Sequence, residues 1–147
     1  MKVIAVLGSP TRHGNTCVLA REVLEGAREA GADTEELFLA EKRIEFCRGC
    51  ISRHIEEMCM STGRCVVADD VEQLRENLYA ADGIILASPS YGLRPTARMK
   101  NFLVDRIGMY TAYTSGLGDK YFVGVSTCGG IGAKKVARDL ANEFLVG

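Results

Sequence analysis

Short apolar runs alternate along this chain with longer segments in which apolar residues recur at helical spacing. The expected strands lie at 3–7, 34–39, 83–88 and 121–126. The expected helices lie at 16–30, from 70 onward, at 96–107 and from 133 to the end. Strand–helix alternation predicts an α/β fold: a doubly wound parallel sheet with helices on both faces and right-handed crossovers. Asp70 and Gln73 have the spacing of a capping box that begins the second helix.

The alternation stops after the fourth helix, so a five-stranded sheet of this kind would lack its last strand. Three explanations stay open: the fold is complete with four strands, another subunit covers the exposed edge, or the chain is a shortened version. A length of 147 residues is that of one domain, which we assign to 1–147.

Charge and hydropathy exclude several classes of protein. The net charge is −1, which gives no basic surface for nucleic acid. The longest apolar runs are far shorter than the roughly 20 residues that span a bilayer, and the N-terminus lacks the apolar stretch of a signal peptide. We therefore expect a cytoplasmic protein with neither a membrane nor a nucleic-acid partner. In that compartment its six cysteines are thiols or ligands rather than disulfides.

The loop after the first expected strand, residues 8–16, leads directly into a helix. Parallel α/β sheets bind ligands at the carboxyl ends of their strands, which directs attention to this loop. It has neither the Walker sequence nor the G-x-G-x-x-G dinucleotide pattern. It does combine hydroxyls, an amide, Arg12 and the free N–H groups of a helix start, a combination that suits a phosphate dianion. The alternative is an ordinary turn in which Thr16 caps the helix.

Two further loops at the same edge carry glycine, hydroxyl and aromatic groups. Residues 88–95 hold a rigid turn with Tyr91 and Gly92, and residues 126–130 hold Thr127 and two glycines. Each loop alone is made of ordinary turn residues. Together with the first loop, which suits a phosphate, they indicate a mononucleotide with a planar head, and flavin mononucleotide (FMN) fits.

Three motifs resemble those of the NAD(P)H-dependent FMN reductase family of flavodoxin-like proteins. They are Gly8-Ser9-Pro10-x-Arg12-x-Gly14-Asn15-Thr16, Ser88-Pro89-x-Tyr91 and Lys100-x-Phe102-x-x-Asp105-Arg106. The resemblance implies a flavodoxin-like fold and phosphate contacts from Ser9, Arg12, Asn15 and Thr16. It implies ring contacts from Pro89, Ser90, Tyr91 and Gly92, and from Thr127, Gly129 and Gly130. We interpret Lys100, Asp105 and Arg106 as a solvated helix face with its ion pairs and leave them out of the site.

Four cysteines lie in a loop at about 46–66 that has no regular periodicity. The spacing Cys47-x2-Cys50-x8-Cys59-x5-Cys65 predicts a soft metal centre, either tetrahedral zinc or an iron–sulfur cluster. The stretch resembles that of the iron–sulfur flavoproteins, a branch of the same family, which implies a [4Fe–4S] cluster. Residues 52–58 lengthen the compact spacing of that branch, and His54 among them is an alternative ligand.

The resemblance implies an FMN-binding, flavin-dependent oxidoreductase in which a cysteine-ligated iron–sulfur cluster and FMN pass electrons. We expect no catalytic acid or nucleophile, a redox partner such as ferredoxin or NAD(P)H, and a homodimer or tetramer that brings one subunit's cluster to its neighbour's flavin. Two alternatives stay open: an NAD(P)H-dependent FMN or quinone reductase without a cluster, and a non-catalytic zinc-binding domain. Of the other cysteines, we expect Cys17 to be a small buried residue and Cys128 to touch flavin.

Overall fold

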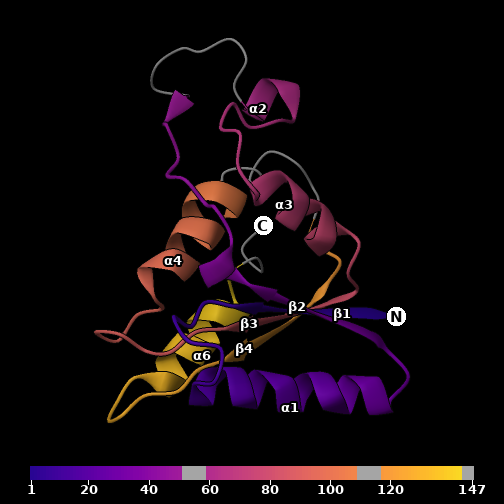
Figure 1. Ribbon diagram of the computed structural model, residues 1–147, viewed down its shortest axis with the longest axis vertical. Helices are drawn as coiled ribbons and strands as arrows, with labels where there is room; N and C mark the ends of the chain where they lie inside the picture. Colours follow the sequence, from indigo (N-terminus) through magenta and orange to yellow (C-terminus); the bar gives the residue numbers. More distant parts are fainter. Residues whose placement is uncertain (51–58, 109–116, 144–147) are drawn as a thin grey trace.

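Four parallel strands form the centre of the molecule (Figure 1). The computed structural model describes residues 1–50, 59–108 and 117–143. The strands are β1 (Lys2–Leu7), β2 (Asp33–Phe38), β3 (Gly83–Ala87) and β4 (Tyr121–Val125). Their order is β2-β1-β3-β4, and every neighbouring pair is parallel. The sheet therefore reverses its winding direction beside β1, which confirms the doubly wound α/β fold expected from the sequence.

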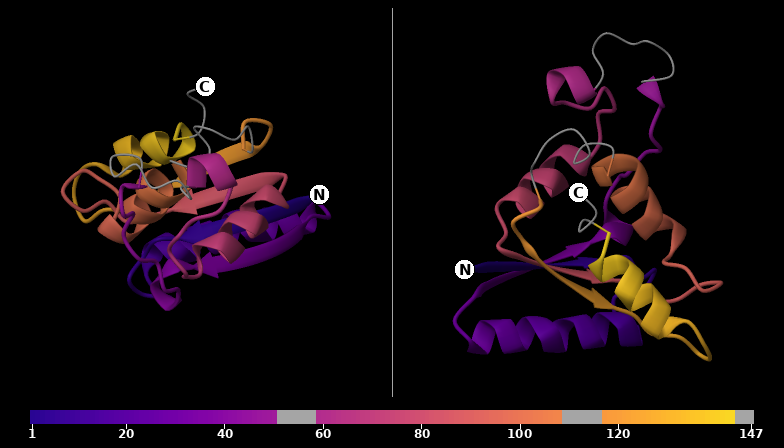
Figure 2. Two further views of the ribbon diagram at one scale, coloured as in Figure 1. Left: turned by 90° about the horizontal axis from the view of Figure 1, so that it is seen from above. Right: turned by 180° about the vertical axis from the view of Figure 1, so that it is seen from behind.

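Helices cover both faces of the sheet (Figure 2). The α-helices are α1 (Asn15–Glu29), α2 (Cys59–Thr62), α3 (Val71–Tyr79), α4 (Ala97–Lys100) and α6 (Ala133–Ala141). A 3-10 turn, η1 (Leu39–Glu41), follows β2, and α4 continues directly into the π-helix η3 (Asn101–Gly108). Helix α1 packs on one face, whereas α3, η3 and α6 share the core of the other. No helix in the described part of the chain is long and apolar enough to cross a bilayer.

Successive side chains of the strands point to opposite faces, so each strand contributes to two cores. Ile4 and Val6 of β1 belong to the core shared with α3, η3 and α6, and Ala5 and Leu7 to the core under α1. Each fully buried Ile or Leu contributes roughly 1.5–3 kcal/mol relative to an exposed one. This double burial explains why β1 is apolar at every position after its first.

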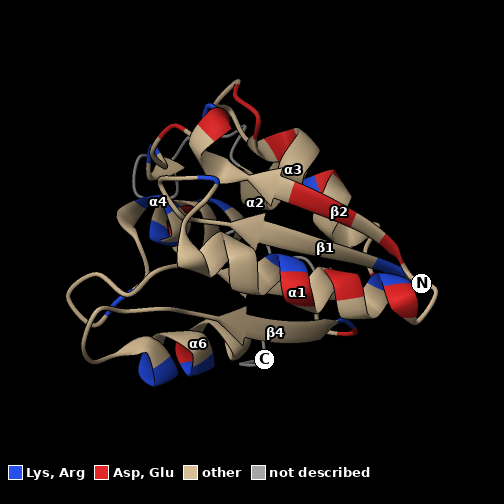
Figure 3. Cartoon of the chain, turned by 60° about the horizontal axis from the view of Figure 1, so that its bottom comes forward, with Lys and Arg blue, Asp and Glu red and all other residues tan. Residues whose placement is uncertain are grey.

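The two edge strands differ in charge, since β2 contains acidic residues and β4 contains no charged residue (Figure 3). Strand β2 carries acidic residues, of which Glu36 pairs with Arg21 of α1 at 2.8 Å, and such charges discourage pairing with a further strand. On β4, by contrast, Tyr121 is 78% exposed and Val123 is 44% exposed. The edge at β4 is therefore the apolar one.

The structure corrects the expected helix starts. Asp70 does not cap α3: its backbone is already helical, so its carboxylate cannot reach the first-turn N–H groups, and it accepts from the backbone N–H of Arg43 instead. The carboxylate of Asp69 accepts from the N–H of Val71. Thr16 does not cap α1 either, since it lies inside a helix that begins at Asn15.

Candidate functional site

The loops after β1, β3 and β4 surround a cavity of about 350 Å³ at the carboxyl edge of the sheet, a size typical of small-molecule sites. Most of the lining side chains are small and polar. The lining residues are Ser9, Pro10, Thr11, Gly14, Asn15, Thr16, Pro89, Ser90, Tyr91, Thr127, Cys128 and Gly129. Loops that lie 36 or more residues apart in sequence thus form one site because their strands are parallel neighbours.

Hydrogen bonds hold these loops in register with each other. The buried hydroxyl of Thr96 donates to the Gly8 carbonyl at 2.8 Å, and the Thr96 N–H donates to Ser88 Oγ at 2.9 Å. The hydroxyls of Thr16 and Thr127 meet at 2.6 Å and connect the start of α1 to the loop after β4. These contacts fix the three walls of the cavity relative to one another.

The first loop presents the N-terminus of α1 to the cavity. No side chain of the described residues caps this helix, and its first turn contains no acidic residue. The unpaired N–H groups and the helix dipole therefore make this end of the cavity favourable for an anion. Ser9 Oγ lies in the preceding turn, where it accepts from the N–H of Thr11 at 3.3 Å.

The loop after β3 forms the opposite wall. Tyr91 and Arg94 exchange backbone hydrogen bonds around a tight turn in which Gly92 and Leu93 both have positive φ, 57° and 64°. A non-glycine residue in this region carries strain, a feature that occurs often at ligand sites. The hydroxyl of Ser90 is buried and has no hydrogen-bond partner among the described residues.

Eight of the eleven residues expected at the FMN site line the cavity, and three do not. Arg12 forms a fork with the carboxylate of Glu41 and lies over the ring of Phe38 at 4.7 Å. This pairing lowers the pKa of Glu41. Gly92 lies in the tight turn rather than on the wall, and Gly130 lies outside the lining.

Three residues of the wall were not among the expected contacts, and the two remaining cysteines lie in different surroundings. Pro10, Thr11 and Gly14 line the cavity, and the only signal for them is their place in the first loop. Cys128 lines the cavity, as expected of a residue in the loop after β4. Cys17 is fully buried, and burial raises the pKa of its thiol.

The four cysteines of the loop at 46–66 are near enough to influence one another electrostatically. Burial raises the pKa of the Cys59 thiol, and the nearby thiols of Cys65, Cys47 and Cys50 raise it further. Cys47 is exposed and the other three are half-buried. Within the described residues no three His, Cys, Asp or Glu side chains are arranged to hold a metal ion, and His54 lies outside those residues.

The chemistry of this donor set nevertheless suits an iron–sulfur cluster. Cys47 Sγ accepts from the Gly49 N–H at 3.4 Å, and Cys65 Sγ accepts from the Val67 N–H at 3.5 Å. Hydrogen bonds to ligand sulfurs are among the contacts that tune such clusters. Four thiols, two of them with an N–H donor at the sulfur, therefore have the chemistry of the group that the sequence predicts.

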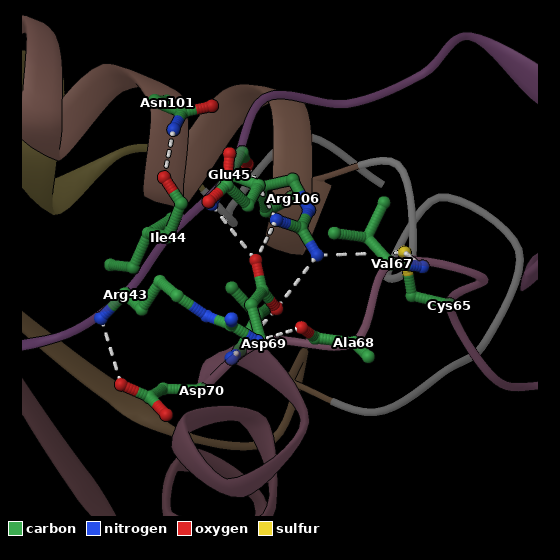
Figure 4. A network of polar contacts seen from close by, with 11 residues as sticks. Arg43, Ile44, Glu45, Cys65, Val67, Ala68, Asp69, Asp70, Asn101 and Arg106 are labelled. Atoms are coloured by element: carbon green, nitrogen blue, oxygen red, sulfur yellow. Dashed lines mark hydrogen bonds and ion pairs between the residues drawn. The ribbon is translucent and has the colours of Figure 1, made fainter.

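Arg106 was expected on a solvated face and is instead buried, with 3% of its surface exposed (Figure 4). Its guanidinium forms a fork with the Asp69 carboxylate, at 2.5 Å and 3.1 Å. The interpretation was wrong because it assumed that a charged helix residue faces water, whereas this one has a buried partner 37 residues earlier in the chain. Lys100 and Asp105 are exposed, as expected.

A doubly wound parallel sheet with a cavity of this kind at its switch point defines the class of flavodoxin-like proteins. The model of the family described as NADPH-dependent FMN reductase matches residues 1–146. An iron-sulfur flavoprotein of Methanocaldococcus jannaschii is 36% identical over 99% of this chain and 72% of its own length. An iron-sulfur flavoprotein of Archaeoglobus fulgidus is 32% identical over 99% of this chain and 62% of its own length. The chain belongs to the NADPH-dependent FMN reductase family, in the group of its iron–sulfur flavoproteins.

Solved structures support the fold. An NAD(P)H:quinone oxidoreductase from Methanothermobacter marburgensis superposes with a TM-score of 0.68, at 19% identity, over 97% of this chain and 74% of that one. An NADH:FMN oxidoreductase in its apo form gives a TM-score of 0.62 at 18% identity, over 97% of this chain and 68% of that one. The chain spans about three fifths to three quarters of the length of the two curated relatives described above.

Proposed function

We propose that this protein binds FMN in the cavity at the carboxyl edge of the sheet and passes electrons between FMN, a cysteine-ligated [4Fe–4S] cluster and a redox partner. The observation that carries the proposal is the cavity itself, whose walls come from three loops held together by Thr96, Thr16 and Thr127. One end of the cavity, at the start of α1, favours an anion, and the opposite wall carries the ring of Tyr91. A flavin phosphate has the charge and shape for the first end.

The proposed contacts follow this polarity of the cavity. Ser9, Asn15 and Thr16 would hold the phosphate at the start of α1, where the helix dipole favours negative charge. Arg12 would contribute its charge from outside the lining, since its guanidinium pairs with Glu41 of η1. Pro89, Ser90 and Tyr91 would contact the ring from one loop, and Thr127 and Gly129 from the other.

Cys47, Cys50, Cys59 and Cys65 are the proposed ligands of the cluster. Bound FMN would supply one- and two-electron chemistry, and the cluster one-electron transfer. The chain's own residues would hold these groups and set their potentials, with no acid, base or nucleophile among them. NAD(P)H and ferredoxin are the proposed donors or acceptors, in a cytoplasmic setting.

Association of copies is part of the proposal. In one chain α2, which begins at Cys59, lies above α3 and away from the sheet, whereas the loops after β1, β3 and β4 lie beside the sheet at the carboxyl ends of the strands (Figure 1). A homodimer or tetramer in which one copy's cysteine loop faces the next copy's cavity would shorten the electron path. The apolar edge at β4, with Tyr121 and Val123 exposed, is a surface that association could cover.

Comparison of FMN with riboflavin tests the flavin site, because the two ligands differ only in the phosphate. Quenching of flavin fluorescence by the apoprotein should give FMN an affinity at least tenfold higher than that of riboflavin. Ser9→Asp places a carboxylate beside the proposed phosphate and should reduce that preference, while riboflavin binding serves as the control. Equal affinities for the two flavins in the native protein would place the phosphate outside this cavity.

The visible spectrum of anaerobically purified protein tests the cluster. Flavin bands over a broad brown absorbance that bleaches with dithionite, together with protein-bound iron and sulfide, are the expected result. Cys65→Ser should lose the iron, whereas Cys17→Ala, which alters a buried cysteine outside the loop, should retain it. Flavin without iron would favour a reductase without a cluster, and bound zinc without flavin would favour the non-catalytic domain.

A further inference from the structure

A buried ion pair lies directly beneath the cysteine loop and has no place in the cofactor contacts proposed above. The side chain of Arg106 in η3 is 2% exposed, and that of Asp69 is 1% exposed. A guanidinium buried to this extent requires partners for its donors. Here the carboxylate takes both arms of the fork, with Nη1 at 2.5 Å from Oδ2 and Nη2 at 3.1 Å from Oδ1.

The same guanidinium also contacts both flanks of the cysteine loop (Figure 4). Its Nη1 donates to the carbonyl of Glu45, two residues before Cys47, at 2.5 Å. Its Nη2 donates to Cys65 Sγ at 3.5 Å, within the range of a hydrogen bond to sulfur. One side chain from a helix thus ties together the segment that enters the loop and the cysteine that ends it.

Asp69 holds this guanidinium in place from the other side. Its Oδ2 accepts from the backbone N–H of Glu45 at 2.9 Å, and its Oδ1 accepts from the N–H of Val71 at 3.2 Å. The backbone N–H groups of Glu45 and Val71 therefore hold the carboxylate, and the carboxylate in turn fixes the plane of the guanidinium. A lysine could supply the charge of Arg106 but not the planar fork that reaches a carboxylate and a sulfur together.

We propose that Arg106 is a positioning residue for the cluster, oriented by Asp69, which holds Cys65 Sγ and raises the reduction potential at the cysteine loop. This inference rests on the proposed function, because it requires a cluster on those cysteines. Reduction adds negative charge to a cluster, so a buried cation that donates to a ligand sulfur favours the reduced form. The carboxylate of Asp69 opposes this effect in part.

The two charges therefore make opposite predictions, which a merely structural role would not. Removal of the cation in Arg106→Met should lower the midpoint potential of the cluster, and removal of the anion in Asp69→Asn should raise it. Arg106→Lys keeps the charge and loses the fork, so it should shift the potential less than Arg106→Met. Arg98→Met, which removes an exposed arginine of α4, is the matched control and should leave the potential unchanged.

The experiment is a dithionite titration of each purified holoprotein, followed by electron paramagnetic resonance of the reduced cluster, with iron content and thermal unfolding measured on the same samples. Equal potentials for Arg106→Met and Arg98→Met would overturn the inference, as would shifts of the same sign in the Arg106 and Asp69 variants. If Arg106→Met does not fold, the shift in Asp69→Asn and the altered signal of Arg106→Lys decide the matter. Native protein without iron would instead overturn the proposed cluster, and the inference with it.

Discussion

Replacement of Thr96 by valine tests whether one hydroxyl joins two walls of the cavity. Thr96 is 6% exposed, and valine matches its shape while removing only the hydroxyl. In the native protein that hydroxyl accepts from the N–H of Met99 at 3.3 Å, as the N-cap of α4, and donates to the carbonyl of Gly8 at 2.8 Å. Both contacts are buried, so water cannot replace either one in full.

The expected loss of stability follows from these two contacts. Loss of an N-cap costs about 1 kcal/mol. A buried carbonyl left without its donor costs about 1–3 kcal/mol. Together they predict that Thr96→Val lowers the free energy of unfolding by about 2–4 kcal/mol. Because Gly8 begins the first loop, FMN affinity should fall as well.

Urea unfolding of the apoprotein, followed by circular dichroism, measures the loss of stability, and quenching of flavin fluorescence measures FMN affinity. The control is Thr34→Val, which makes the same exchange at a half-buried position of β2 and leaves the cavity loops unchanged. The reasoning is refuted if Thr96→Val and Thr34→Val have the same unfolding midpoint and the same affinity for FMN.

Three further tests each address one feature of the structure. Thr127→Val removes the hydroxyl contact between the loop after β4 and the start of α1. In a fluorescence titration it should weaken FMN binding about five- to tenfold, equivalent to roughly 1 kcal/mol, and native affinity would contradict this. Gly132→Ala, at φ +108°, should lower the free energy of unfolding in urea by about 1–3 kcal/mol. By contrast, Gly26→Ala, at an exposed position in the last turn of α1, should raise it by up to about 0.5–1 kcal/mol. A gain in stability at both positions would refute the strain at Gly132. Burial raises the pKa of Asp69, but hydrogen bonds from Arg106 and from backbone N–H groups outweigh burial and leave the pKa lowered. The ionised carboxylate therefore stabilises the fold above the unfolded pKa of about 3.9, and this stabilisation is lost as pH falls through the lower folded value. In urea unfolding, the stability advantage of the native protein over Asp69→Asn should shrink between pH 7 and pH 3, and a constant difference would exclude the linkage.

The site was predictable to the extent that it depends on the ends of strands. The loops that hold Ser9, Ser90 and Thr127 were expected at one site because each loop follows a strand and parallel strands end at one edge of the sheet, while the family resemblance supplied the individual residues. The structure brings all three to the cavity. Arg12 follows the same strand, yet its long side chain reaches Glu41 instead. The sequence predicts at which edge of the sheet a loop lies, but the partner of a long charged side chain depends on which residues the tertiary structure brings near it.

Local periodicity in the sequence determined the four strands, their alternation with helices and the edge at which the loops meet. It did so because the periods of strands and helices, two and 3.6 residues, are set by residues that lie close together in the chain. The tertiary structure alone decided that Arg106 is buried against Asp69, that Thr96 joins two loops and that Asp70 accepts from Arg43. Each of these contacts joins residues 27 or more positions apart, and each becomes visible only when packing brings the two elements together.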